Sequence, residues 1–363
     1  MFFGSGNLVF PLLVGKISEG HFGLAAIGIL ITGVLVPFLG ILAMLLFNGN
    51  SNEFFNRLGK PATFWFPLVA LSLMGPFGVL ARCITVAHGA FRLFIAETPL
   101  WLFSIISCGI IFALAIRKNR IVPVLGTMLT PLLLLALCAL AWFGIGGNPF
   151  PTTSSVSAWS SLKEGLLQGY QTMDLLAAFF FSSFVIRHLR EGTNQSQPSL
   201  SIFLKSGLLG AGLLAAVYIG LVILGATYAP SLASVPPEEM LSFIAQKALG
   251  VWAAPVVCTA IILACFTTGV VLASLFADFF RKEVMKEKAS SAVALTVTLV
   301  IAFFTSTLEF SGIAKVLNPI MGIIYPALIT LTILNIGFKL WGWKQLRMPT
   351  AVAVIVKLIT SAI

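Results

Sequence analysis

The sequence predicts an all-α polytopic membrane protein, and three observations carry that prediction. Of the 363 residues, 58% are hydrophobic and only 9% are charged, and the mean hydropathy is +1.03. Soluble domains carry roughly 25% charged residues, so this chain has too few charges for the polar surface of a soluble fold. Apolar runs of about 20 residues, the length that crosses a bilayer, follow one another along the chain. These observations exclude a soluble enzyme, a disordered chain and a fibrous protein.

The apolar runs predict about eleven spans, the first of them incomplete. The chain opens on Met1–Pro11, which is too short to span and has glycines where a signal peptide has its apolar core. We interpret it as the second half of a first span, and we favour a true start upstream of Met1 over a truncated protein. Ten further runs follow: Phe22–Phe47, Ala62–Ala87, Pro99–Ile116, Ile121–Phe143, Leu167–Ile186, Ile202–Tyr228, Val251–Phe280, Ser291–Leu308, Ile313–Phe338 and the partial run Pro349–Ile363.

The basic residues predict the orientation of these spans. The formal net charge is +10, from 22 Lys and Arg against 12 Asp and Glu. Basic residues collect in cytoplasmic loops, and a cytoplasmic N-terminus places fifteen of the 22 on that side. We therefore expect a membrane protein with its N-terminus on the cytoplasmic side. The positive charge is explained without a nucleic-acid partner.

Sequence motifs for other chemistries are missing from the chain. It has no GxxxxGK[ST] phosphate loop, so ATP is not the expected energy source. It has no HExxH or GxSxG motif and no paired intramembrane acids, and its three histidines lie at span ends. We therefore expect neither an enzyme nor a bound cofactor. An ion channel would need a repeated selectivity filter or a ring of polar residues, and we find neither in the sequence.

Two interruptions of the apolar pattern point to a transporter. The first is Gly4–Asn7, and the second is Gly169–Asp174, which opens the sixth predicted span. Five spans separate them, so the two helices run in opposite directions. Paired interruptions of this kind are typical of inverted-repeat transporters with a midplane site; the alternative is a packing notch of small residues. We predict one transmembrane domain with repeats at 1–143 (helices 1–5) and 167–338 (helices 6–10), followed by a partial eleventh helix at 349–363.

The first interruption also carries a resemblance to a known family. Gly4-Ser5-Gly6-Asn7-Leu8-Val9-Phe10-Pro11 resembles the FFGAGNLIFP signature of the branched-chain amino acid:cation symporters, the BrnQ-type carriers. Similar motifs follow in the same order over the whole chain: Met74–Phe77 with Arg82 and Thr85, Gly169–Asp174, and Ala264–Gly269. The resemblance implies a LeuT-like five-plus-five inverted repeat that imports leucine, isoleucine and valine with Na⁺ or H⁺. A carrier of the same fold for purines or polyamines is the alternative.

The resemblance also implies the binding residues. The substrate carboxylate would meet backbone amides near Ser5 and Gly6, and the ammonium would meet carbonyls freed at both interruptions. The predicted substrate-binding residues are Phe2, Gly4, Ser5, Gly6, Asn7, Gly169, Tyr170, Gln171, Thr172 and Asp174. In related sodium symporters the eighth helix supplies hydroxyls and the first helix supplies carbonyls, which implies a Na⁺ site at Phe3, Thr267 and Thr268. The alternative for the threonines is a bond back to the helix's own carbonyls. A second first-helix carbonyl of that site would fall before Met1.

Asp174 is the most informative acid in the sequence. A charge inside a span costs roughly 2.5–3.5 kcal/mol or more, so its presence there favours a function. It could bind the coupling cation, carry a proton, pair with Arg82, or cap the helix that follows it. We expect Arg82 and His88 to reach the membrane interface from the outer end of the third span. The coupling ion and the oligomeric state stay open, although the two threonines favour sodium.

Overall fold

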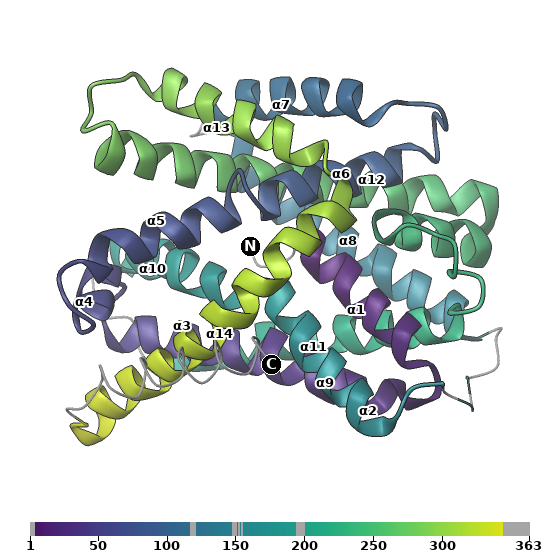
Figure 1. Ribbon diagram of the computed structural model, residues 1–363, viewed down its shortest axis with the longest axis horizontal. Helices are drawn as coiled ribbons and strands as arrows, with labels where there is room; N and C mark the ends of the chain where they lie inside the picture. The colour runs from purple at the N-terminus through teal and green to yellow at the C-terminus, as the bar shows by residue number, and fades with distance from the viewer. Residues whose placement is uncertain are drawn as a thin grey trace.

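The computed structural model describes residues 4–116, 121–146, 151, 153, 155–193 and 200–343, and the secondary structure of this part is helical throughout (Figure 1). The longer elements are α1 (Ser5–Ser18), α2 (Phe22–Leu30), α3 (Val36–Leu46), α5 (Ala62–Met74), α6 (Val79–Phe91), α7 (Leu100–Ile116), α8 (Ile121–Gly146), α9 (Ala158–Gln171), α10 (Asp174–Thr193), α11 (Leu200–Thr227), α12 (Met240–Phe279), α13 (Ser291–Ser306) and α14 (Glu309–Trp341). The short elements are α4 (Ser51–Asn56), η1 (Glu19–His21), η2 (Ile31–Leu35), η3 (Pro237–Glu239) and η4 (Phe280–Val284).

Length and composition make many of these helices candidate membrane spans. Five helical stretches qualify at full length: Ser5–Leu46, Ala62–Phe91, Leu204–Thr227, Ala254–Val284 and Glu309–Trp341. The first of these contains a chain reversal, because Glu19 takes a φ of 43° between α1 and α2. Shorter apolar helices are Leu100–Ile116, Pro131–Gly146 and Ser291–Ser306. The predicted eleventh span, 349–363, lies outside the described residues.

One group of helices packs around α1. Helix α1 lies against α9 and α11, α2 against α9, and α3 against α10. Small residues bring these backbones together: a Cβ atom added at Gly15 of α1 would lie 2.0 Å from the Val222 carbonyl oxygen of α11. At Gly165 of α9 it would lie 2.1 Å from the Ala25 oxygen of α2. We call α1, α2–α3, α9–α10 and α11 the bundle.

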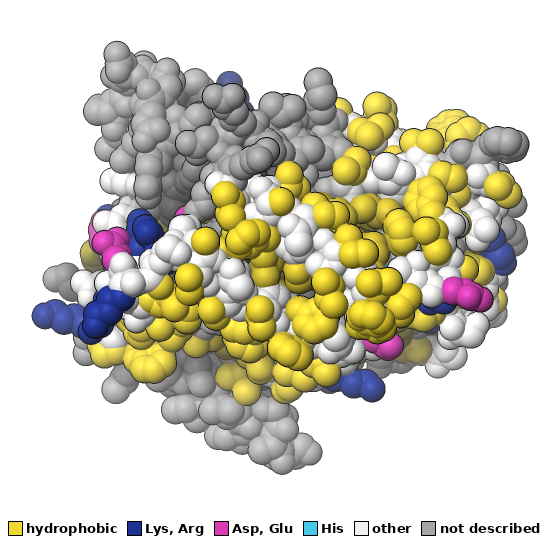
Figure 2. Space-filling model, turned by 90° about the horizontal axis from the view of Figure 1, so that it is seen from above, with side chains coloured by type: hydrophobic (Ala, Val, Ile, Leu, Met, Phe, Trp, Pro, Cys, Tyr) yellow, Lys and Arg dark blue, Asp and Glu magenta, His cyan; other side chains and the backbone are white. Residues whose placement is uncertain are grey.

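A second group, which we call the scaffold, is formed by α6, α7, α12 and α13. Helix α6 packs along α12, and α7 and α13 pack on each other and on α12. Helices α7 and α13 lie side by side at the top of Figure 1. Their outer surface is apolar, with exposed side chains at Trp101, Ile105, Ile106, Val300 and Phe304. Figure 2 shows a broad face of hydrophobic side chains with charged ones gathered toward its two ends. Such a band is what a lipid-facing surface requires.

The structure contains an interruption that we did not predict. We expected a continuous third span over Ala62–Ala87, but α5 ends at Met74 and α6 begins at Val79. Gly75 and Gly78 have non-helical backbone angles, and a Cβ at Gly78 would lie 2.0 Å from the Leu73 carbonyl oxygen. A hydropathy pattern does not detect this interruption because the residues around it remain apolar.

The sixth span also starts earlier than predicted. We predicted this span over Leu167–Ile186, yet α9 begins at Ala158, where the Ser157 side chain accepts a hydrogen bond from the Ser160 N–H. With 14 residues, and with Lys163 and Glu164 among them, α9 is shorter and more polar than the candidate spans. It packs on α2 through its glycines.

The start of the eighth span agrees with the prediction at Val251. Helix α12 begins at Met240, but Gly250 within it takes φ 72° and ψ −175°, a conformation that only glycine adopts readily. The chain therefore bends at Gly250, and the membrane-crossing part follows it. Val251–Phe280 was the predicted span.

Candidate functional site

The two predicted interruptions meet at a buried polar cluster. The Asn7 side chain accepts a hydrogen bond from the Gly4 N–H (3.0 Å) at the start of α1. Its Nδ2 donates to Asp174 Oδ2 (2.8 Å) and to the Tyr218 hydroxyl oxygen (2.6 Å). The Tyr218 hydroxyl in turn donates to Asp174 Oδ2 (2.8 Å). This Asn7–Asp174–Tyr218 cluster joins α1, α10 and α11.

The acidic group of this cluster, the Asp174 carboxyl, has no basic side chain beside it in the described part of the chain. Asp174 and Asn7 are each 2% exposed, and Tyr218 is fully buried. Asn7 and Tyr218 both donate to Asp174, which is the arrangement that an ionised carboxylate requires. Asp174 is also the first residue of α10, where the helix dipole favours negative charge. Among the described residues no Lys, Arg or His lies within 4.0 Å of this carboxylate. The cluster is therefore suited to a cation.

The backbones at the two interruptions are in direct contact. A Cβ atom added at Gly6 would lie 3.2 Å from Thr172 Cα, so a larger residue at Gly6 would push the two segments apart. The Thr172 hydroxyl donates to the Gly169 carbonyl oxygen (2.9 Å), and Met173 takes a φ of 60° where α9 gives way to α10. The structure thus brings Gly4, Gly6 and Asn7 together with the second predicted segment. Phe2 and Phe3 lie outside the described residues.

Ser5 and Tyr170 complete the predicted set. The Cys83 thiol of α6 lies 3.5 Å from the Ser5 hydroxyl oxygen, which places α6 beside the start of α1. The Tyr170 ring packs against the Tyr325 ring of α14 with 4.9 Å between centroids. Tyr325 is fully buried. Helices α6 and α14 therefore wall the site from outside the bundle.

Arg82 does not reach the membrane interface, which corrects our expectation. Its side chain is 1% exposed, and its two terminal nitrogens donate to the backbone oxygen (3.0 Å) and side-chain oxygen (3.1 Å) of Gln171. Because the third span is interrupted before Val79, Arg82 lies in the first turns of α6, beside the interruption of α9–α10. His88, one to two turns further along α6, is partly buried, and its Nε2 lies 2.7 Å from the Thr98 carbonyl oxygen.

Thr267 and Thr268, the two predicted sodium ligands, differ from each other in their surroundings. The Thr267 hydroxyl donates to the Ala264 carbonyl oxygen (2.9 Å) of its own helix, as in the structural alternative for these residues. The Thr268 methyl group would lie 3.4 Å from a Cβ atom at Gly4, so Thr268 faces the start of α1. The sodium site remains a prediction. Among the described residues, no group of three or more His, Cys, Asp and Glu side chains could hold a metal ion.

The sequence reasoning missed Tyr218 and Tyr325 altogether. The chain has only four tyrosines, and these two lie within long apolar helices, where a hydroxyl needs a polar partner. That isolation was a usable signal. What it could not provide is the identity of the partner, because Tyr218 and Asp174 meet through the packing of separate helices.

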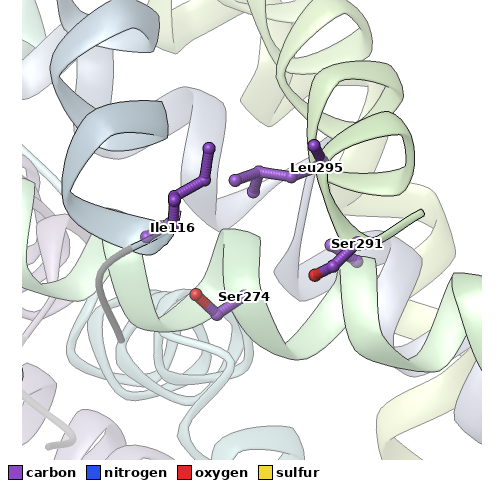
Figure 3. A pocket seen from close by; sticks show the side chains of 7 residues that line it. Ile116, Ser274, Ser291 and Leu295 are labelled. Atoms are coloured by element: carbon purple, nitrogen blue, oxygen red, sulfur yellow. The ribbon is translucent and has the colours of Figure 1, made fainter. Parts of the chain in front are cut away.

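A small hollow lies apart from the cluster, between the ends of three scaffold helices. Ile116 of α7, Ser274 of α12, and Ser291 and Leu295 of α13 line it, and its volume is about 270 Å³ (Figure 3). None of the predicted site residues lines it. The candidate site therefore remains the Asn7–Asp174–Tyr218 cluster and the two interruptions that meet there.

Sequence comparisons connect the whole chain with one family. A family model described as branched-chain amino acid transport protein matches residues 1–363. The branched-chain amino acid permease BrnQ of Corynebacterium glutamicum is 31% identical over 340 residues, which cover 93% of this chain and 78% of that protein. The branched-chain amino acid permease BraB of Bacillus subtilis is 28% identical over 359 residues, which cover 95% and 79%.

Structural comparisons agree on the fold. The crystal structure of MhsT in complex with L-phenylalanine has a TM-score of 0.66 at 17% identity, covering 98% of this chain and 95% of that one. The inward-facing conformation of Mhp1 has a TM-score of 0.63 at 13% identity, covering 91% and 74%. The fold is therefore the LeuT-like five-plus-five arrangement that the sequence predicted.

Proposed function

Because the chain belongs to the branched-chain amino acid transport protein family, it is a multi-pass transporter of the bacterial inner membrane and not an enzyme, and we propose that it imports leucine, isoleucine and valine by symport with Na⁺ or H⁺. The observation that carries the proposal is the buried Asn7–Asp174–Tyr218 cluster at the meeting point of two interrupted helices. Permease relatives named for branched-chain amino acids support the substrate class.

We propose that Asp174 receives the positive charge that enters the site. Its carboxylate is held by neutral donors, so either the substrate ammonium or the coupling cation can complete its charge balance. Backbone N–H groups at the start of α1, near Ser5 and Gly6, offer a second pole for a carboxylate. Thr268, which faces this start from α12, is our proposed sodium ligand.

The packing of the helices supports alternating access. All three members of the Asn7–Asp174–Tyr218 cluster belong to the bundle, so the cluster can move as one body. The Arg82–Gln171 bonds and the Thr268–Gly4 contact join the scaffold to the bundle. We propose that the bundle rocks against the scaffold around the site and that these contacts change as it does so.

Uptake by the reconstituted full chain tests the function. Radiolabelled leucine uptake into proteoliposomes is measured without a gradient, with an inward sodium gradient, and with an inward proton gradient. We expect one of the two gradients to drive accumulation, and excess isoleucine or valine to compete. Leucine uptake that is indifferent to both gradients would contradict symport, and no leucine uptake at all would contradict the substrate assignment.

A further inference from the structure

Arg82 carries a buried positive charge that no acid balances. Its side chain is 1% exposed, and among the described residues no carboxylate lies within 4.0 Å of its guanidinium. Its contacts are the two oxygens of Gln171 and the faces of two aromatic rings, Phe10 at 5.0 Å and Phe310 at 5.4 Å from the guanidinium carbon. Neutral partners offset only part of the cost of burying an ion, which is why buried arginines are normally paired.

The Nε atom of the same guanidinium has no hydrogen-bond partner although it is buried. A buried N–H without an acceptor is costly, and the shape of the guanidinium fork matches a carboxylate, which can accept from Nε and a terminal nitrogen together. The free Nε position of Arg82 is therefore suited to a carboxylate, and no described residue of the protein provides one there.

The unpaired cation and the unpaired anion flank one interruption. Arg82 is bound to Gln171, and Asp174 is three residues further along the same segment, a separation of at most about 11 Å in extended chain. A zwitterionic amino acid carries a carboxylate and an ammonium on one carbon atom. Its carboxylate is the partner that Arg82 lacks, and its ammonium is the partner that Asp174 lacks.

We propose that Arg82 binds the α-carboxylate of the transported amino acid and so restricts transport to substrates that carry this group. The inference rests on the proposed function, because it assigns a residue of α6 to the same site. The carboxylate takes the free Nε position and displaces one Gln171 oxygen from the fork. Each carboxylate oxygen can accept a second hydrogen bond, so the N–H groups at the start of α1, which lies beside α6, can bind the same group. The Phe10 and Phe310 rings exclude water and strengthen this pairing. Because Arg82 is buried, the substrate reaches it only after the bundle and scaffold separate.

The test compares leucine with leucinol, which replaces the carboxylate by an uncharged alcohol. Affinities of both ligands for the purified full chain are measured by competition against radiolabelled leucine or by calorimetry. In Arg82→Gln we expect the leucine affinity to fall about 100-fold and the leucinol affinity to stay within about threefold, since charge-assisted bonds are worth far more than neutral ones. The matched control is Arg92→Gln: Arg92 follows α6, is exposed and pairs with Glu239, and its loss should affect neither ligand.

A second variant keeps the proposal testable if Arg82→Gln does not fold. Gln171→Glu places a permanent carboxylate at the position of the Gln171 side-chain oxygen, 3.1 Å from the fork, where it competes with the substrate. We expect weaker leucine binding and unchanged leucinol binding. Arg82→Lys, which keeps the charge, should recover part of the leucine affinity lost in Arg82→Gln.

The outcomes separate this inference from the proposed function. Wild-type protein that binds no leucine would contradict the function itself. Wild-type protein that binds leucine, together with an Arg82→Gln variant that weakens leucine and leucinol equally or weakens neither, would overturn the role of Arg82 alone. Leucine binding that is unaffected by Gln171→Glu would also overturn it.

Discussion

Asp174 lies where a carboxylate is expensive to bury, and its surroundings show what offsets that cost. A charge in a span costs roughly 2.5–3.5 kcal/mol or more, whereas a hydrogen bond to a charged group contributes about 1.5–3 kcal/mol. Two such bonds, from Asn7 and Tyr218, and the N-terminal position in α10 offset part of this cost. These contacts favour the ionised form of the carboxyl group, and a bound cation would stabilise that form further.

Replacing Asp174 by Asn should abolish its ability to attract a cation. We expect the apparent kcat/KM for leucine uptake to fall by about 100-fold or more, because the amide is neutral and its NH₂ group opposes the donors of Asn7 and Tyr218. Uptake into proteoliposomes measures this. Asp278→Asn, near the end of α12, is the control and should transport normally. Transport retained in Asp174→Asn would contradict the proposed role.

Tyr218→Phe removes one donor from Asp174 and keeps the ring packing. We expect a loss of about tenfold in leucine affinity, since one hydrogen bond to a charged group contributes about 1.5 kcal/mol or more. Equilibrium binding measures it. Because the Tyr228 side chain lies at the helix end beyond α11, Tyr228→Phe is the matched control. Equal affinities for wild-type protein and Tyr218→Phe would show that the hydroxyl does not support the site.

Thr268→Ala tests the proposed sodium ligand. We expect the sodium concentration for half-maximal uptake to rise, while leucine binding at saturating sodium changes little, because the hydroxyl would serve the ion and not the substrate. Thr259→Ala on the same helix is the control, since Thr259 is exposed and bonds to its own helix at the Pro255 oxygen. Equal losses of sodium and leucine affinity would count against the assignment.

At the scale of single residues, the sequence predicts the groups whose role is local. Asn7 and Asp174 could be selected because each lies in an interruption, and they do meet. Arg82 was misplaced because its depth depends on the interruption before α6, which the sequence analysis missed. The partnership of Tyr218 with Asp174 depends on the packing of α11 beside α10, which no local pattern contains.

At the scale of helices, close packing depends on glycines at a few crossings. A Cβ atom at Gly225 of α11 would lie 2.1 Å from the Leu12 carbonyl oxygen of α1, so the helices must separate to accept any side chain there. Gly15 makes the reciprocal approach from α1. This crossing holds α1, and with it Asn7, against the helix that carries Tyr218.

We therefore expect Gly225→Ala to destabilise the protein by about 2 kcal/mol, the usual scale for overpacking, and to lower the melting temperature in detergent. Gly210→Ala is the matched control on α11, because a Cβ atom there meets nothing within 4 Å. Its expected effect is neutral or slightly stabilising, since alanine favours helix. A Gly225→Ala variant as stable as Gly210→Ala would contradict the tight crossing.

The helices whose bounds could be predicted are those that consist of one uninterrupted apolar stretch. Helices α7, α13 and α14 fall within or close to their predicted runs because each is a single apolar stretch. The prediction began the sixth span too late because Lys163 and Glu164 lower the hydropathy of α9. It missed the α5–α6 interruption because the residues on both sides of it are apolar. A break was recognised only where polar residues accompanied the glycines.

At the scale of the molecule, the polar site lies where the two groups of helices meet. The Asn7–Asp174–Tyr218 cluster belongs to the bundle, and Arg82 and Thr268 approach it from the scaffold. Rigid movement between the groups would expose the charges of Asp174 and Arg82 together. The membrane class followed from composition, the inverted repeat from the paired interruptions, and the LeuT-like fold from the family resemblance, whereas this division of the site between two bodies required the three-dimensional packing.

A structure solved with saturating leucine and coupling ion tests the central claim most directly. We expect ligand density at the two interruptions, in contact with Gly4–Asn7 and with Gly169–Asp174, its ammonium end toward the Asp174 side. Leucine density at another place, such as the hollow between α7, α12 and α13, with these two segments closed on each other as they are here, would contradict the account.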